Sequence, residues 1–152
     1  MNKFSHLNIH SQYSISDGLV RLDELSSKAK DLNFESIAIT DDSNLFGFVK
    51  FYKEMRDKGI KPICGVNFNS VKDISDNSES GKLTLYAKNF EGYRNLTKLV
   101  SQSHIEGRIR STPHLKLEWL KDLNEGLILL WGEIKVYIRH LIKKNNFELA
   151  EA

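Results

Sequence analysis

The stretch Ser36-Ile-Ala-Ile-Thr-Asp-Asp-Ser-Asn-Leu-Phe-Gly-Phe-Val-Lys-Phe-Tyr-Lys-Glu-Met55 gives the clearest indication of the fold. Its first part, Ser36–Thr40, predicts a strand because it is short, apolar and rich in β-branched residues. A polar turn follows over residues 41–44. Apolar residues then recur at the spacing of one helix face, at Leu45, Phe48, Val49, Tyr52 and Met55. Strand, polar turn and helix in this order form the repeating unit of an α/β fold.

Similar units are predicted along the rest of the chain. Further strands are expected at Ser5–Ile9, Ile63–Phe68, Leu83–Ala87 and Leu127–Leu130. Further helices are expected at residues 22–32, around 96–100, and at 117–123, 134–142 and from 147 to the chain end. The strand Leu127–Leu130 is purely apolar, so we expect it to be buried on both sides. Residues 70–81 are expected to form a mobile loop and residues 104–114 an irregular basic loop.

Alternating strands and helices favour a parallel sheet or barrel with the helices outside and the strand C-termini on one rim. Polar side chains near the predicted strand ends would meet there, namely His6, Asn8, His10, Asp17, Asp41, Asp42 and Asn67. Histidine and aspartate in such a place could bind metals and activate water. Strand-end polar residues also commonly cap helices and loops. A barrel needs more strands than the five predicted, so we expect residues 1–152 to be an incomplete domain.

The composition is that of a globular protein. Of 152 residues, 40% are hydrophobic and 28% are charged. The longest apolar run, Leu127–Trp131, is far shorter than the roughly 20 residues of a membrane span. The single cysteine, Cys64, is expected in the core and agrees with a reducing, cytoplasmic location. With 22 basic and 20 acidic residues, the net charge of +2 is too small to indicate nucleic-acid binding.

Five segments, in order, resemble the alpha subunits of bacterial DNA polymerase III. They are Phe4–Gly18, Ile37–Gly47, Phe51–Gly65, Leu85–Leu96 and Asn124–Leu130. The resemblance implies the PHP (polymerase and histidinol phosphatase) domain at the start of that subunit. Its fold is α/β, a distorted (β/α)7 TIM-like barrel that is longer than this chain. The chain would therefore be the N-terminal part of a PHP domain.

The resemblance also implies a metal cluster, and the sequence departs from its pattern. The His-x-His motif reads Asn8-Ile-His10, the Thr-Asp-His motif reads Thr40-Asp-Asp42, and the Gly-x-Glu motif reads Gly65-Val-Asn67. Lys82 stands where a histidine is frequent. An amide is a poor ligand for zinc-like metals, and an ammonium repels cations.

We therefore expect no catalytic residue and no bound metal in this segment, only vestigial metal-site positions. These positions are Asn8, His10, Asp17, Asp41, Asp42, Asn67 and Lys82. Lys82 is expected to offset the clustered carboxylates.

For the whole protein, the resemblance implies a DNA-directed DNA polymerase, a nucleotidyltransferase of chromosome replication that uses magnesium. This segment lacks the polymerase palm, so a structural and exonuclease-recruiting role without a cofactor is expected. The implied partners are the remainder of the alpha subunit, the proofreading exonuclease subunit, the clamp, the clamp loader and primer-template DNA, with no membrane. The alternatives are a metal-dependent PHP phosphoesterase or a cis-proofreading nuclease, both of which would need the missing ligands, and an unrelated α/β domain without catalysis.

Overall fold

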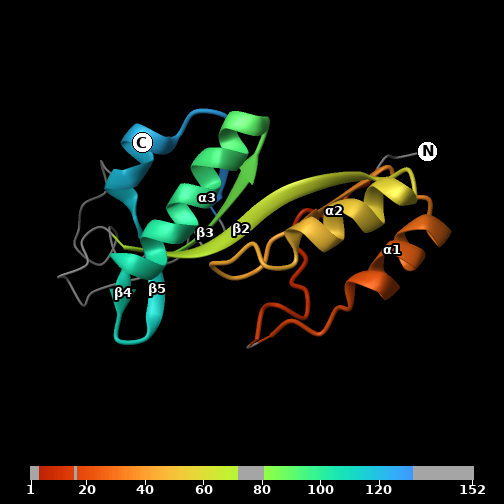
Figure 1. Cartoon of the computed structure of the whole chain (residues 1–152), viewed down its shortest axis with the longest axis horizontal. Helices are drawn as coiled ribbons and strands as arrows, with labels where there is room; N and C mark the ends of the chain where they lie inside the picture. Colours follow the sequence, from red (N-terminus) through yellow and green to blue (C-terminus); the bar gives the residue numbers. More distant parts are fainter. Residues whose placement is uncertain (1–3, 16, 72–80, 132–152) are drawn as a thin grey trace, which may run out of the picture.

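The computed structural model describes residues 4–15, 17–71 and 81–131 (Figure 1). The helices are α1 (Leu22–Asp31), α2 (Phe48–Asp57), α3 (Phe90–Ile105) and α4 (Leu120–Leu123), the last preceded by the 3-10 turn η1 (Leu117–Trp119). The strands are β1 (Ser36–Ile39), β2 (Lys61–Val71), β3 (Gly81–Ala87), β4 (Arg108–Ile109), β5 (Thr112–Lys116) and β6 (Leu127–Trp131). The described part of the chain is therefore a mixed α/β structure, as predicted.

Strand β2 is the centre of the sheet and pairs with three other strands. It runs parallel to β1 and β5 and antiparallel to β3, and β6 joins β3 in antiparallel pairing. The prediction of an all-parallel sheet is wrong. A parallel connection needs a crossover of about a dozen residues or more, whereas only residues 72–80 separate β2 from β3. The described strands form an open sheet in the order β4-β5-β2-β3-β6 and do not close a barrel.

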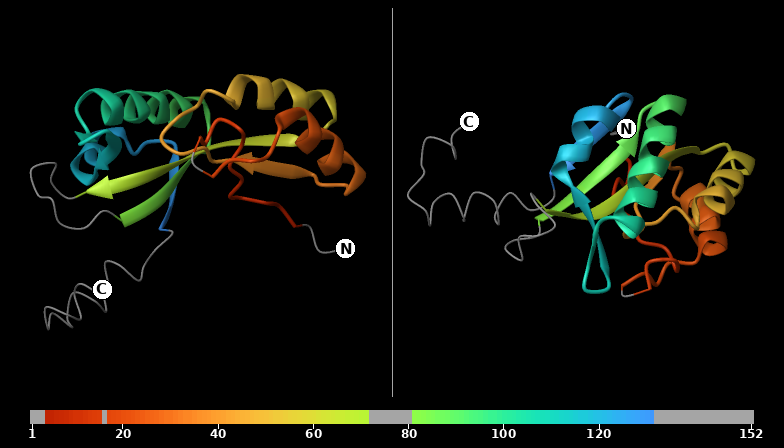
Figure 2. Two further views of the ribbon diagram at one scale, coloured as in Figure 1. Left: turned by 90° about the horizontal axis from the view of Figure 1, so that it is seen from below. Right: turned by 60° about the vertical axis from the view of Figure 1, so that its left-hand side comes forward.

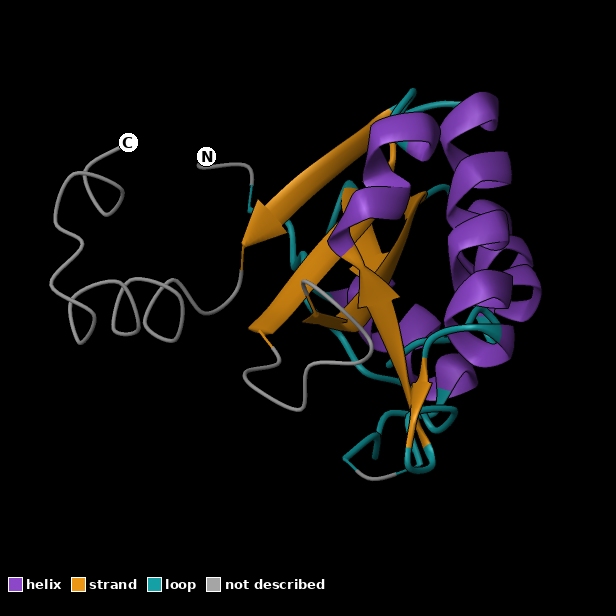
Figure 3. Cartoon of the chain, turned by 90° about the vertical axis from the view of Figure 1, so that its left-hand side faces the viewer, coloured by secondary structure: helices purple, strands orange, loops and turns teal. Residues whose placement is uncertain are grey.

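The helices pack on one side of the strands (Figures 2 and 3). Helices α1 and α2 cover the first core, where Leu22, Phe51 and Met55 are fully buried. Helix α3 covers the second core through Leu96 and Leu99. Its first turn is capped by Asn89 Oδ1, which accepts a hydrogen bond from Gly92 N at 2.9 Å. The second core includes Val66 and Phe68 of β2, and the first core adjoins β2 through its parallel pairing with β1.

The segment predicted as the first strand, Ser5–Ile9, lies beside β1 without forming a regular strand. Ala38 N donates to His6 O at 2.9 Å, and Thr40 N donates to Ile9 O at 2.9 Å. The step from Ala38 to Thr40 is two residues, whereas the step from His6 to Ile9 is three, so the extra residue breaks the ladder as a bulge does. The segment is also held by Tyr86 Oη, which donates to Leu7 O at 2.7 Å.

Two predictions about the C-terminal half are wrong. Residues 104–114 are not an irregular loop, because α3 continues to Ile105 and β4 and β5 form a hairpin whose turn contains Arg110 with φ of 57°. Strand β6 is not buried on both sides, because Ile128, Leu129 and Leu130 are 48%, 40% and 43% exposed. Among the described strands, β6 pairs with β3 alone.

The remaining predicted elements meet the limits of the described residues. In the predicted loop 70–81, Ser70 and Val71 belong to β2 and Gly81 begins β3, while residues 72–80 lie outside the described part. The helices predicted at 134–142 and from 147 onward also lie outside it. No helix in the described ranges has the length and apolar character needed to cross a membrane.

Candidate functional site

Asp41 follows β1 directly and holds the loop over residues 11–14. Its side chain is buried, and Oδ1 accepts hydrogen bonds from Ser11 N at 2.6 Å and from Ser14 Oγ at 2.8 Å. Its other oxygen, Oδ2, accepts from Ser11 Oγ at 2.7 Å. Three charge-assisted hydrogen bonds satisfy this carboxylate within the protein. Asp41 therefore fixes the position of the N-terminal loop.

His10 is held on both sides of its ring. Its Nδ1 lies 3.0 Å from both carboxylate oxygens of Asp17, and its Nε2 lies 2.5 Å from Asn67 Nδ2. An amide NH₂ group can only donate a hydrogen bond, so Nε2 is the acceptor. The proton of the neutral ring is then on Nδ1 and is donated to Asp17. Both ring nitrogens of His10 are thus engaged within the protein.

Asn8 and Asn67 extend this network across the sheet. Asn8 Oδ1 accepts hydrogen bonds from Thr40 Oγ1 at 2.7 Å and from Asn67 Nδ2 at 3.0 Å. Asn67 Oδ1 accepts from Thr84 Oγ1 at 2.6 Å. The two amides therefore tie the N-terminal segment to the end of β1 and to the middle of β2 and β3. We refer to His10, Asp17, Asn8, Asn67, Thr40 and Thr84 as the strand-end network.

Asp42 lies at the margin of the strand-end network. It forms an isolated parallel bridge with Asn67, and its backbone N donates to Ser14 Oγ at 3.0 Å. Burial raises the pKa of its half-buried carboxyl group, and the charges of Asp17 and Asp41 raise it further. The charge of Lys82, and that of His10 in its protonated form, lower that pKa in part. The ionised form of Asp42 is therefore less favoured than that of a free aspartate.

Lys82 acts on the cluster from the adjacent strand. Lys82 is opposite Asn69 in the β2–β3 pairing, and its side chain is exposed. Within the described part of the chain, no ion pair joins Lys82 to Asp17, Asp41 or Asp42. Its effect on Asp42 is thus a longer-range electrostatic one, which supports the predicted compensation without a direct contact.

The arrangement does not fit the multi-metal cluster that the sequence resemblance implies. A metal-ligating histidine must offer a free nitrogen lone pair, and the acceptor nitrogen of His10 already faces the amide of Asn67. The oxygen of Asn67 is bonded to Thr84, and both oxygens of Asp41 are bonded to serines. One smaller group of potential ligands remains, because ligand atoms of His10, Asp17 and Asp42 lie within 4.8 Å of one another.

The other residues singled out in the sequence lie elsewhere. His6 is exposed and packs edge-on against Phe4 and Phe34, with ring centroids 4.7 Å and 5.1 Å away, so it does not join His10. Cys64 is buried in the second core, where burial raises the pKa of its thiol to about 12. Its place in the core confirms the prediction.

The hydroxyl groups of the site were not predicted from the sequence. Ser11, Ser14, Thr40 and Thr84 complete the hydrogen bonds of the carboxylate and the amides. Ser11 and Ser14 lie in the polar loop after the first predicted strand, and Thr40 directly precedes Asp41. That proximity was a usable signal, whereas Thr84 comes to the site only through the β2–β3 pairing.

The family model and similar curated proteins agree on the family of this chain. The family model of the PHP domain matches residues 6–152. The DNA polymerase III subunit alpha of Borreliella burgdorferi is 41% identical over 157 residues, which covers 99% of this chain and 14% of the relative. The subunit of Escherichia coli strain K12 is 45% identical over 130 residues, which covers 86% of this chain and 11% of the relative. The chain thus spans only a small fraction of the length of these relatives.

The solved structures agree on the fold. A protein assigned as a metal-dependent phosphoesterase from Bifidobacterium adolescentis superposes with a TM-score of 0.53 at 15% sequence identity. The match covers 69% of this chain and 34% of that protein. At this identity the likeness shows the fold alone, and the open sheet corresponds to part of that larger structure.

Proposed function

The chain belongs to the PHP domain family, and on this premise we propose that it is the N-terminal PHP segment of a bacterial DNA polymerase III alpha subunit. Identity of 41–45% to two such subunits over most of this chain supports the proposal. The relatives extend far beyond the matched region, since the chain covers 11% and 14% of them. DNA-directed DNA synthesis, with its magnesium ions and primer-template DNA, would reside in that larger remainder.

The segment itself would have a structural and recruiting role without a cofactor of its own. The observation that carries this proposal is that both ring nitrogens of His10 are occupied, by Asp17 and by Asn67. The network that would hold metals in an active relative instead ties the N-terminal segment to the sheet. Its partners would be the remainder of the alpha subunit and the proofreading exonuclease subunit, with the clamp and clamp loader reached through the whole cytoplasmic replicase.

A segment exchange tests the proposal. The matching part of the Escherichia coli K12 subunit is replaced by this chain, and primer extension and co-elution with the exonuclease subunit are measured. We expect both to be retained, and to be retained also when the exchange carries Asp17→Asn, because no catalytic step is assigned to Asp17. A folded chimera that neither extends primers nor binds the exonuclease would contradict the proposal.

Restoring ligands tests the vestigial character of the site. In the exchanged subunit, the combined change Asn8→His, Asp42→His, Asn67→Glu and Lys82→His should make the thermal midpoint rise on addition of zinc or manganese. The same subunit without these changes should show no such rise. Equal metal stabilisation of both proteins would mean that the native residues already bind the ion.

The second candidate is a metal-dependent phosphoesterase. It is favoured by the placement of His10, Asp17 and Asp42, whose ligand atoms lie within 4.8 Å of one another. Hydrolysis of p-nitrophenyl phosphate with manganese or zinc, measured on the purified chain and its His10→Ala variant, separates the two functions. Turnover that disappears in the variant would favour the phosphoesterase.

A further inference from the structure

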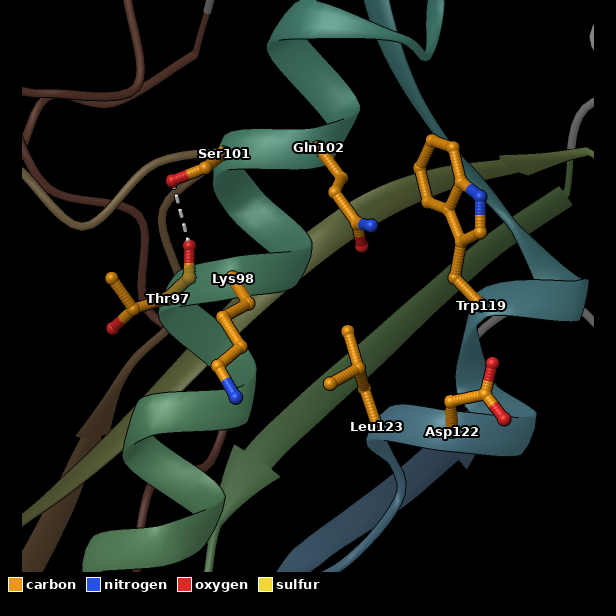
Figure 4. Close-up of a pocket in the computed structure, with 7 residues that line it drawn as sticks. All are labelled: Thr97, Lys98, Ser101, Gln102, Trp119, Asp122 and Leu123. Carbon is orange, nitrogen blue, oxygen red and sulfur yellow. Dashed lines mark hydrogen bonds between the residues drawn. The ribbon is translucent and has the colours of Figure 1, made fainter.

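A groove lies between α3 and the short helical segment η1–α4, away from the strand-end network. It encloses about 460 Å³ and is lined on one wall by Lys98 and Gln102 of α3. The opposite wall is formed by Trp119, Asp122 and Leu123 (Figure 4). None of these residues takes part in the strand-end network, so the groove has no role in the function described so far.

The apolar part of the groove comes from Trp119 and Leu123. Both are half-buried and pack against the second core, so their remaining surface is held in a fixed place. Figure 4 shows the indole ring of Trp119 facing the Gln102 side of α3 across the groove. A fixed, partly exposed tryptophan beside a leucine is a typical anchor surface for an apolar side chain of a partner.

Gln102 adds an unsatisfied polar group. Among the described residues, its Oε1 is the buried side-chain oxygen that has no hydrogen-bond partner. Buried acceptors are nearly always paired, and an unpaired one costs about 1–3 kcal/mol. Because the terminal amide can turn over without changing its shape, Gln102 can present either its oxygen or its NH₂ group to the groove. A donor from a bound molecule would remove this cost once the Gln102 side chain turns this buried oxygen toward the groove.

Lys98 and Asp122 place opposite charges on the two walls. Both side chains are exposed, and neither forms an ion pair or hydrogen bond with another residue of the described part. Figure 4 shows them projecting from α3 and α4 respectively. A ligand that crosses the groove would therefore meet a cation on one side and a carboxylate on the other.

We propose that this groove binds a segment of a partner polypeptide, which inserts an apolar side chain between Trp119 and Gln102 and directs an acidic side chain to Lys98. A polypeptide segment fits better than a single small ion, because it supplies at once an apolar group, backbone N–H donors for Gln102 and charges of both signs. The inference rests on the recruiting role proposed above and gives that role a location.

Peptide selection on the full 152-residue chain tests the groove. A displayed library of random peptides is selected on the chain, and the enriched peptides are then measured on the variants. We expect enriched peptides to carry a large apolar residue with an acidic residue nearby. Their affinity should fall at least tenfold in Trp119→Ala and up to about fivefold in Lys98→Glu, which removes an exposed charge contact. Lys88→Glu, an exposed lysine outside the groove, is the matched control and should leave affinity unchanged.

The peptide preference of the Lys98→Glu variant tests the proposal without depending on a change in folding. Because Lys98 is exposed, this variant should keep the unfolding midpoint of the parent, and selection on it should enrich basic rather than acidic residues. Failure to enrich any peptide, or enriched peptides indifferent to both groove variants, would overturn the proposal. Peptides that bind the chain but not the exchanged polymerase subunit would mean that the same polypeptide covers the groove, which also overturns it. The exonuclease co-elution described above is scored separately, so failure of the groove and failure of the recruiting role are distinguishable.

Discussion

Asn67 Nδ2 lies 2.5 Å from Nε2 of His10, although the two residues are 57 positions apart in the chain. The contact joins the middle of β2 to the N-terminal segment and uses the imidazole nitrogen that a metal would need. A position that aligns with a metal-bridging carboxylate in the resemblance thus holds the segment by a neutral amide. The site keeps its geometry through hydrogen bonds rather than through bound cations.

Replacing Asn67 should loosen the N-terminal segment. Asn67→Ala removes hydrogen bonds to His10, Asn8 and Thr84, and it leaves the part-buried Nε2 of His10 without its partner, whereas Asn8 Oδ1 keeps Thr40. We expect the free energy of unfolding to fall by about 1–3 kcal/mol, measured by urea denaturation. Asn69→Ala, on the same face of β2, is the control and should change it by less than about 0.5 kcal/mol. Equal losses in both variants would argue against the network.

Asp41 should be more sensitive than any exposed aspartate. In Asp41→Asn, a neutral amide oxygen replaces the charged acceptor of Ser11 N and Ser14 Oγ, and Ser11 Oγ meets an NH₂ group to which it can no longer donate. A loss of roughly 2–4 kcal/mol in unfolding free energy is expected, because charge-assisted bonds are lost and donors stay buried. Asp57→Asn on the exposed side of α2 provides the comparison. If Asp57→Asn lowered the free energy of unfolding by a similar amount, the loss in Asp41→Asn would result from the change in net charge rather than from its hydrogen bonds.

The raised pKa of Asp42 gives a defined pH dependence. Burial raises this pKa above 3.8, so in the pH range between 3.8 and the raised value the folded state binds more protons than the unfolded state. This group therefore makes stability fall as the pH rises through that range. In Asp42→Asn that fall should be absent, so its unfolding midpoint in urea should decrease less between about pH 4 and pH 7. Asp122→Asn, an exposed carboxyl group, should follow the parent profile.

Lys82 should tune Asp42 from a distance. Its charge lowers the pKa of Asp42, so Lys82→Ala should raise that pKa further, as followed by the NMR shift of the carboxyl carbon. The accompanying loss of stability should be below about 1 kcal/mol and larger at neutral than at acid pH, where Asp42 is protonated. Lys88→Ala is the control and should leave the pKa of Asp42 unchanged. If Lys82→Ala also left this pKa unchanged, Lys82 would have no such effect.

The sequence predicted what short-range patterns determine. Helices α1 and α2 follow their apolar stripes, and Cys64 lies in the core. The direction of β3 and the hairpin of β4 and β5 were not predicted, because strand pairing depends on connection length and on contacts distant in sequence. The residues brought together at the site include His10, Asp17 and Asp42, as expected, but the roles of Ser14 and Thr84 depend on pairings that no local pattern encodes.

Strand β2 connects the two hydrophobic cores, because Lys61–Cys64 pair with β1, whose Ile37 and Ile39 lie in the first core, and because its own Val66 and Phe68 lie in the second. Separating the two cores would require breaking this one strand in its middle, where Val66 and Phe68 are buried. The two halves therefore cannot open independently, as two domains joined by a linker could. Hydrogen exchange of the β2 amide protons would then report a single cooperative opening of the described structure. A force that a partner applies to one half would be transmitted to the other half through the β2 backbone.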